Sequence, residues 1–192
     1  KIQQNQAEFD TILKESQELG LAEADPTMDI SGLDAAYKLV ILAAVAFKVD
    51  IQLDNISYQG IESISLRDIQ YAEEFGYTIK LLAIGKRQSK SMSFSVQPTM
   101  IHHNHPLAHI HNELNAVYIY GNAVGEALLS GKGAGGSPTG SAVISDIIDI
   151  AFNHTHTLSQ RNLETTLQTT DITSPDELVG QHYFRLKVAD HP

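Results

Sequence analysis

Hydrophobic positions follow different spacings in different parts of the chain. Residues 7–19 carry apolar side chains at helical spacing, and Gly20 suits the position that follows such a helix. Residues 35–47 are apolar on every side except at Lys38, and a helix that is apolar all round is typically buried. The pattern therefore predicts an amphipathic helix and then a buried helix, Leu33–Phe47, in which Lys38 has little water around it.

Local signals place the remaining elements. Ser31 suits the N-cap of the buried helix. Ser65 and Asp68 have the spacing of a capping box, with Asp in place of Glu, and they predict a helix that Gly76 closes. Strands are predicted where short apolar or alternating runs are bounded by turn residues. These runs cover residues 48–52, 77–88, 92–97, 115–120, 122–129 and 183–188.

Together these elements predict an α+β fold with a mixed or antiparallel sheet covered on one side by helices. We assign residues 1–152 to one domain, whose last helix, residues 138–152, begins at Pro138. Residues 153–180 are rich in Thr, Ser, Asn, Gln and His, which predicts a linker. Residues 181–192 begin a further unit. The chain does not begin with Met, and we expect it to be part of a longer protein.

Composition argues against several kinds of partner. A chain of 192 residues can bury one substantial core. Its net charge of −10 argues against nucleic acid and against anionic membranes. The longest apolar stretch, residues 39–47, is shorter than the roughly 20 residues that span a bilayer. There is no cysteine, so neither disulfides nor thiolate metal sites form, and we expect a cytoplasmic protein.

The candidate chemistry is concentrated just before and within the start of the buried helix. Glu23 and Asp25 lie in the preceding loop, and Asp34 and Lys38 follow on the helix. Asp34 precedes Lys38 by four residues, so both side chains rise from one helix face. Two interpretations stay open. The residues form a structural ion pair, or Lys38 is held by carboxylates in a partly dry site and transfers protons.

Two other clusters of residues are candidate binding sites. The glycine-rich residues 131–136 either bind an anion at the helix that follows or let two backbones pass closely, and their spacing favours close passage. Five histidines lie between residues 102 and 111. A catalytic zinc needs three protein ligands, but His105 precedes a proline and no carboxylate lies nearby until Glu113. We therefore predict solvent-facing histidines and no metal site.

One motif resembles the signature of homoserine dehydrogenase. It consists of Asp25-Pro26, Asp29-Ile30, Gly32, Asp34 and Lys38, seven positions at fixed spacing. The chain departs from the family pattern at Ser16, where the family has a small alanine. The resemblance extends to about residue 151. It continues through Gly60-Ile61, Ile79 to Ala83, His105-Pro106-Leu107-Ala108, Asn115-Ala116-Val117 and the run from Gly131 to Ala142.

The resemblance implies a substrate-binding and dimerisation domain in residues 1–152. The parent enzyme would interconvert L-aspartate 4-semialdehyde and L-homoserine with NAD or NADP, on the route to threonine, methionine and isoleucine, and would form a homodimer. Glu23 and Asp34 would hold the substrate ammonium, and Lys38 would transfer the proton. The glycines that would border the cofactor cleft are Gly20, Gly131, Gly133 and Gly135.

The resemblance also implies parts that would precede Lys1. These are the dinucleotide-binding domain, a second lysine and a monovalent-cation site, so we expect the isolated chain to be inactive. Residues 181–192 are similar to the first strand of an ACT regulatory domain. An alternative is a non-catalytic dimerisation or amino-acid-sensing module derived from the same family, which a parent chain without a dinucleotide fingerprint would favour.

Overall fold

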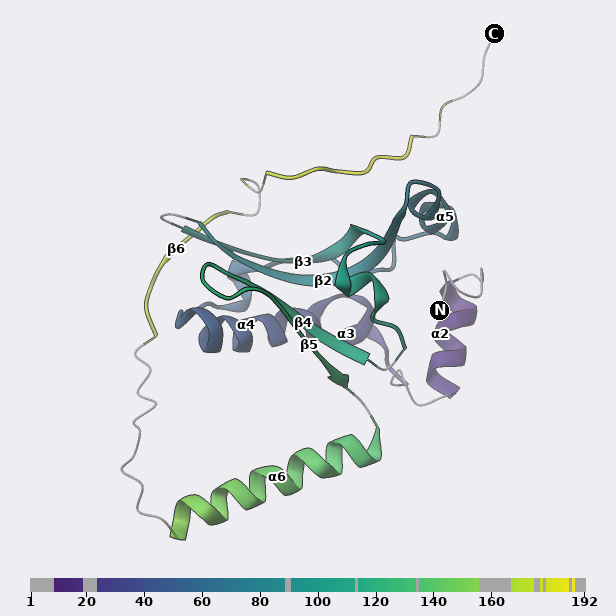
Figure 1. Cartoon of the computed structure of the whole chain (residues 1–192). Helices are drawn as coiled ribbons and strands as arrows, with labels where there is room; N and C mark the ends of the chain where they lie inside the picture. The colour runs from purple at the N-terminus through teal and green to yellow at the C-terminus, as the bar shows by residue number, and fades with distance from the viewer. Residues whose placement is uncertain are drawn as a thin grey trace.

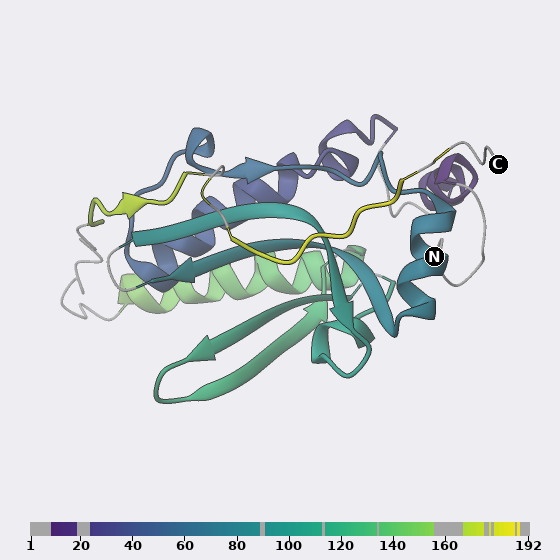
Figure 2. The ribbon, with the colours of Figure 1, turned by 90° about the horizontal axis from the view of Figure 1, so that it is seen from above.

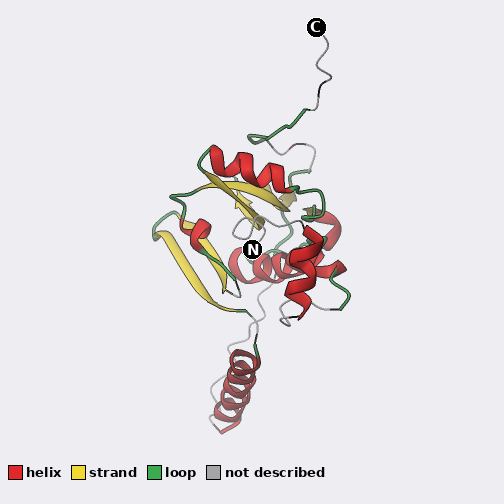
Figure 3. Cartoon of the chain, turned by 90° about the vertical axis from the view of Figure 1, so that its right-hand side faces the viewer, coloured by secondary structure: helices red, strands yellow, loops and turns green. Residues whose placement is uncertain are grey.

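The computed structural model describes residues 9–18, 24–88, 91–112, 114–133, 135–155, 167–174, 177, 179–186 and 188. Figure 1 shows the chain and Figure 3 its helices and strands. In chain order the elements are α2 (Phe9–Glu18), α3 (Thr27–Ile30), α4 (Leu33–Phe47), η1 (Leu53–Asn55), β1 (Ser57–Tyr58), α5 (Leu66–Glu74), β2 (Tyr77–Arg87), β3 (Ser91–His102), η2 (Pro106–His109), β4 (Leu114–Gly121), β5 (Gly125–Lys132), α6 (Gly136–Thr155) and β6 (Asp171–Ile172).

The main sheet is organised around β3. Along one edge, β2 pairs antiparallel with it over the whole of Tyr77–Arg87. Along the other edge, β6 pairs parallel with residues 91–92 and β1 pairs parallel with residues 95–96. The sheet is therefore mixed. Because α3 and α4 lie against one side of β2 and β3 in Figure 1, the predicted α+β fold with helices on one side is confirmed.

The core forms where α4 meets β3. Three α4 side chains at helical spacing point toward the sheet, and alternate residues of β3 meet them. Apolar residues from the segment after α4 complete the cluster. Its buried members are Ala36, Leu39, Ala43, Val49, Ile51, Ile56, Met92, Phe94 and Val96.

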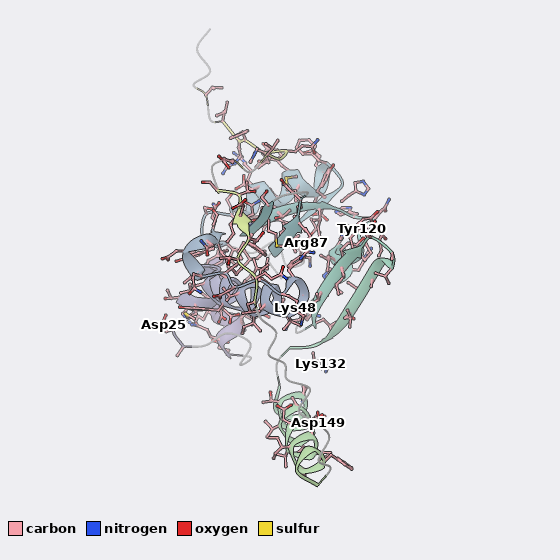
Figure 4. The ribbon with its side chains drawn as sticks, turned by 90° about the vertical axis from the view of Figure 1, so that its left-hand side faces the viewer. Asp25, Lys48, Arg87, Tyr120, Lys132 and Asp149 are labelled. Atoms are coloured by element: carbon pink, nitrogen blue, oxygen red, sulfur yellow. The ribbon has the colours of Figure 1, made fainter. Side chains whose placement is uncertain are left out.

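The end of α4 is held by β2. Nη2 of Arg87 donates to the carbonyl oxygen of Phe47 at 3.0 Å, and its guanidinium lies 5.5 Å from the centre of the Phe47 ring. A cation at a helix C-terminus offsets the partial negative charge of the unpaired carbonyls. Gly85 leaves room for this contact, because a Cβ there would lie 3.1 Å from the Phe47 ring. Figure 4 labels Arg87 beside Lys48, the residue that follows α4.

A second, two-stranded sheet leads into α6. β4 and β5 pair antiparallel from Leu114 opposite Lys132 to Gly121 opposite Gly125. α6 then stands apart from both sheets, with Lys132 near its start and Asp149 along it (Figures 1 and 4). Its described side chains, apart from Pro138, are exposed. Within the described residues, no helix is both long and apolar enough to cross a membrane.

The prediction that α4 is buried on all sides is wrong. Only the face with Ala36, Leu39 and Ala43 is buried, whereas Ile41 and Val45 are 63% and 64% exposed. The sheet covers one side of the helix, and no described element covers the opposite side of these two residues. An all-apolar sequence therefore indicates here a helix with two apolar faces, and the described residues cover only one of them.

Three local predictions also need correction. Ser31 does not cap α4, because it ends α3 and Gly32 takes the N-cap position. Residues 48–52 do not form a strand, since among them only Val49 makes an isolated bridge, to Gln168. The described part of residues 183–188 is extended but pairs with no described strand.

Other local predictions are confirmed within small shifts of their ends. The capping box opens α5, with Asp68 N donating to Ser65 Oγ at 3.3 Å and Ser65 N donating to Asp68 Oδ2 at 3.0 Å. Gly76 closes that helix with φ +82°. The strand predicted from residue 92 continues to His102, and the helix predicted from Pro138 begins at Gly136.

Part of the predicted linker, residues 153–180, returns to the main sheet. Gln168 N donates to Lys48 O at 2.8 Å, and Thr173 N donates to Met92 O at 2.8 Å. β6 lies between these two contacts. The chain therefore leaves the two sheets at α6 and makes contact with the main sheet again from residue 168.

Candidate functional site

The candidate site is built at the junction between α3 and α4. Gly32 begins α4 with φ +82°, a conformation that glycine adopts without strain. The loop after β1 packs directly against this junction. Ile61 N donates to Ile30 O at 2.8 Å, and a Cβ on Gly60 would lie only 2.0 Å from that same oxygen. A close backbone contact that only glycine permits therefore fixes where α4 begins.

Asp34 and Lys38 face each other near the start of α4. Nζ of Lys38 donates to Oδ2 of Asp34 at 2.5 Å. Their spacing of four residues is the feature that brings them together. Asp34 also lies in the first turn, where the partial positive charge of the helix favours a carboxylate. An acid and an amine thus stand side by side, a pair that can bind a charged ligand and move a proton.

The structure does not place this pair in a dry site. The Lys38 side chain is 65% exposed and that of Asp34 is 40% exposed. The prediction that Lys38 has little water around it is therefore wrong for the described residues, because the sheet covers a different face of α4. An exposed ion pair at this spacing contributes about 0.3–0.5 kcal/mol to stability. The pair accordingly adds little to the fold.

Asp25 organises the loop that precedes α3. Its Oδ1 accepts hydrogen bonds from the hydroxyl of Thr27 at 2.6 Å and from the backbone N–H of Thr27 at 3.1 Å. The side-chain bond, followed by the backbone bond, lowers the pKa of Asp25 below its usual 3.8. Figure 4 shows Asp25 at the edge of the molecule. The predicted site residues Gly20 and Glu23 lie outside the described residues.

The three predicted cofactor glycines lie where β5 leads into α6. Gly131 is in β5, Gly133 follows that strand, and Gly135 has φ +117° just before the helix. Gly131 and Gly133 line a hollow of about 290 Å³ with Asn115. A Cβ on Gly133 would lie 1.4 Å from Nδ2 of the exposed Asn115 side chain, so a larger residue there would push that side chain aside. A Cβ on Gly131 would meet no atom within 4 Å, so a close passage of two backbones at these two glycines stays a prediction.

The model of the family described as "Homoserine dehydrogenase" matches residues 1–148. The chain belongs to the homoserine dehydrogenase family. It is 44% identical over 186 residues to a homoserine dehydrogenase of Helicobacter pylori, which matches 97% of this chain. It is 39% identical over 190 residues to one from Bacillus subtilis, which matches 99% of it.

Solved homoserine dehydrogenases have a similar fold. A structure from Thiobacillus denitrificans aligns over 90% of this chain and 41% of its own, with a TM-score of 0.83 and 41% identity. A hyperthermophilic archaeal homoserine dehydrogenase mutant, solved in complex with NADPH, aligns over 75% of this chain and 40% of its own, with a TM-score of 0.60 and 32% identity. The chain spans about 44% of the length of the two curated relatives named above.

The histidines that the structure describes make separate local contacts. The ring of His102 packs against Tyr77 with centroids 5.5 Å apart, and that of His105 packs against Tyr118 at 4.8 Å. Nδ1 of His105 also accepts from the backbone N–H of Leu107 at 3.2 Å. In the part of the chain that the structure describes, no group of three or more His, Cys, Asp or Glu side chains could hold a metal ion.

Lys80 is a half-buried charge that the sequence analysis did not single out. Its Nζ donates to the carbonyl oxygen of Ile110 at 2.6 Å, which ties β2 to the loop after η2. Burial lowers the pKa of Lys80 from its usual 10.5. Burial, followed by the charge of Lys80, lowers the pKa of His111 as well. A lysine inside an apolar strand is a signal that could have drawn attention to this position.

Proposed function

We propose that this chain is the substrate-binding part of a homoserine dehydrogenase that interconverts L-aspartate 4-semialdehyde and L-homoserine. The observation that carries the proposal is the Asp34–Lys38 pair, joined at 2.5 Å at the start of α4 within the family match. The full-length protein would act in the biosynthesis of threonine, methionine and isoleucine.

Each member of the pair suits one end of the substrate. Homoserine carries an ammonium group, for which the carboxylates of Asp34 and Glu23 are suitable ligands. During reduction the aldehyde oxygen gains negative charge as hydride reaches the carbon, and the Lys38 ammonium donates its proton to that oxygen. During oxidation neutral Lys38 accepts the proton of the hydroxyl group while hydride leaves the same carbon.

A nicotinamide cofactor, NAD or NADP, supplies or accepts the hydride when it is bound. Gly131, Gly133 and Gly135 fit beside such a group because they expose backbone rather than side chains. A Cβ on Gly131 would meet no atom within 4 Å, so that stretch of backbone is open to a ligand. Gly20 would join them. The relative solved with NADPH supports NADP as the cofactor, and the exposed backbone of these glycines suits NAD equally.

The proposal requires other parts of the assembled enzyme to cover α4. Exposed Tyr37, Ile41 and Val45 share that helix with Lys38. Soluble proteins rarely leave contiguous apolar patches uncovered. Covering this face would exclude water from Lys38 and would strengthen its attraction for a developing oxyanion.

We also propose that the protein forms a homodimer. The β4–β5 hairpin carries exposed apolar side chains, among them Val117 directly opposite Leu129. A two-stranded sheet is marginally stable without a further layer. A second copy related by two-fold symmetry, the commonest closed arrangement, would supply that layer.

The test measures reduced nicotinamide formed from L-homoserine by the full-length protein. We expect turnover with NAD or NADP. Asp34→Asn should lower kcat/KM for homoserine by about 10- to 150-fold, the effect of losing a hydrogen bond to a charged group. The control is Asp54→Asn, which removes one exposed carboxylate in η1. A full-length protein without turnover would favour the non-catalytic module instead.

A further inference from the structure

One carboxylate fastens residues 181–186 to α5. Nε of Arg185 donates to Oδ1 of Asp68 at 2.6 Å and its Nη2 donates to Oδ2 at 3.2 Å, while the Tyr183 hydroxyl donates to Oδ1 at 3.1 Å. The Asp68 side chain is 9% exposed. A bidentate arginine–carboxylate pair is among the stronger polar contacts in proteins. We call Asp68, Tyr183 and Arg185 the Asp68 latch.

The extended shape of the segment explains which side chains take part. Successive side chains of an extended chain point in opposite directions, so Tyr183 and Arg185 both face α5. Phe184 and Leu186 point away and are 80% and 84% exposed. Figure 2 shows this segment running along the main sheet toward the end where α5 lies. Polar contacts rather than apolar burial therefore hold it in place.

Asp68 is also part of the turn that starts α5. Its Oδ2 accepts from the backbone N–H of Ser65 at 3.0 Å and from the Ser65 hydroxyl at 2.5 Å. Nη2 of Arg185 reaches the same hydroxyl at 3.3 Å. Arg185 therefore binds both residues of the capping box, Ser65 and Asp68. Any shift of Arg185 changes contacts in the first turn of α5.

A short loop connects that turn to the start of α4. Ile64 N donates to Ile61 O at 3.1 Å, which closes a turn just before Ser65. Ile61 N in turn donates to Ile30 O at 2.8 Å, and a Cβ on Gly60 would lie only 2.0 Å from that same oxygen. Gly32, two residues later, is the N-cap of α4. Four hydrogen-bonded steps, joined by short pieces of backbone, thus lead from Arg185 to Ile30, two residues before the N-cap of α4.

We infer that the Asp68 latch holds the C-terminal segment and positions the start of α4 through the loop of residues 59–65. Tyr183 and Arg185 touch neither Asp34 nor Lys38 in this arrangement, so they are positioning residues. That the latch holds residues 181–186 is inferred from the hydrogen bonds of Tyr183 and Arg185 to Asp68 alone. The effect on substrate rests on the proposed function, and separate measurements test the two.

The first measurement is the heteronuclear NOE and amide exchange of the 192-residue chain, with Arg185→Gln compared with Arg67→Gln. Arg67 is an exposed arginine on α5 outside the latch. Arg185→Gln should lower the NOE of residues 182–186 to values typical of a flexible chain and speed exchange of the Ile61 amide about tenfold. Arg67→Gln should change neither.

Two results would overturn the inference. If residues 182–186 stay as rigid as in the parent chain, there is no latch. If they are released but the Ile61 amide is unaffected, the latch does not position α4. Should Arg185→Gln fail to fold, Tyr183→Phe removes one hydroxyl, and the same two readouts then decide.

The second measurement uses the full-length enzyme. Arg185→Gln should raise KM for homoserine about 2- to 30-fold, the usual range for coupling at a distance, and leave KM for the cofactor unchanged. Arg185→Lys keeps the charge without the paired donors and should recover part of the loss. A lower folded fraction alone would reduce kcat and leave both KM values unchanged, and that result would contradict positioning. If the full-length protein does not use homoserine at all, the NMR measurement still tests whether the Asp68 latch holds residues 182–186 and affects the Ile61 amide.

Discussion

Nζ of Lys38 lies 2.5 Å from Oδ2 of Asp34, one helical turn away, and both side chains are open to solvent in this chain. In such a setting the two charges attract each other only weakly, because water screens them. The arrangement is available to a ligand, since a substrate ammonium can take the place of Lys38 beside the carboxylate. Whether the two charges interact strongly enough to act in catalysis therefore depends on what covers them in the full-length protein.

Lys38→Met should remove proton transfer and leave the fold intact. In the full-length enzyme we expect kcat to fall about 10²- to 10⁴-fold, the scale for losing a general acid–base group. The chain itself should lose only about 0.3–0.5 kcal/mol of stability, which urea unfolding can measure. Lys14→Met, at an exposed position on α2, is the matched control. Full activity in the Lys38 variant would return the residue to a structural role.

The isolated 192-residue chain should not oxidise homoserine. Holding the nicotinamide ring against the substrate supplies about 7–11 kcal/mol of the barrier. Among the described residues, the proposed cofactor contacts are limited to the surface around Gly131, Gly133 and Gly135. The measurement mixes the purified chain with homoserine and either cofactor and follows the reduced nicotinamide. Turnover near the ~10 s⁻¹ of a typical enzyme would show that the cofactor site lies within these residues.

Asp68 should make stability depend on pH in acid. Burial alone raises the pKa of this carboxyl, but hydrogen bonds from Arg185, Ser65 and Tyr183 outweigh burial and lower it from 3.8 to about 2. A depressed pKa in the folded state stabilises the protein above the unfolded value, and this contribution is lost as the pH falls through the folded value. The full contribution is about 2 kcal/mol.

The measurement compares urea unfolding of the parent chain and Asp68→Asn between pH 6 and pH 2. The parent should be more stable than the variant near neutral pH. This difference in stability should narrow below pH 4, where the unfolded chain binds a proton at Asp68 first and the folded protein follows only near pH 2. A gap that stays constant with pH would mean that the charge of Asp68 contributes nothing and only its shape matters.

The histidine cluster should be silent in catalysis. Replacing His102, His103 and His111 together by Gln in the full-length enzyme should leave kcat/KM near that of the parent. His102 has a structural contact, with its ring against Tyr77, so a modest loss of stability is expected instead. A loss of more than about tenfold, equal to roughly 1.4 kcal/mol, would contradict this prediction.

The protein should sediment as a dimer at micromolar concentration. Val117→Glu places a charge on the exposed face of β4, where Leu129 lies directly opposite, and should shift the equilibrium toward monomer. Glu74→Lys, at the exposed end of α5, changes charge elsewhere and serves as the control. A parent protein that sediments only as monomer would refute the homodimer.

Sequence signals that act over a few residues predicted their elements well. The Ser65–Asp68 capping box opened α5 where expected, and the spacing of Asp34 and Lys38 brought their side chains together. Such signals succeed because each contact closes within one helical turn, whatever the rest of the fold does.

Contacts between distant residues could not be predicted in this way. Arg185 reaches Asp68 across 117 positions, and nothing in the local pattern of either residue points to the other. β6 is two residues long and lies in a polar stretch, so only its partner β3 makes it a strand. The prediction that α4 is buried on all sides is wrong for a related reason. An apolar pattern reports that a face needs cover, without saying which chain supplies it.

Gln168 connects the chain to the main sheet again after α6. Gly133 and Gly135 lie just before that helix, and after it Gln168 pairs with Val49, close to the end of α4. The stretch that contains α6 is therefore joined to the rest of the chain at both of its ends. A partner that packs on α6 stays linked, through two points of the chain, to the helix that carries Asp34 and Lys38.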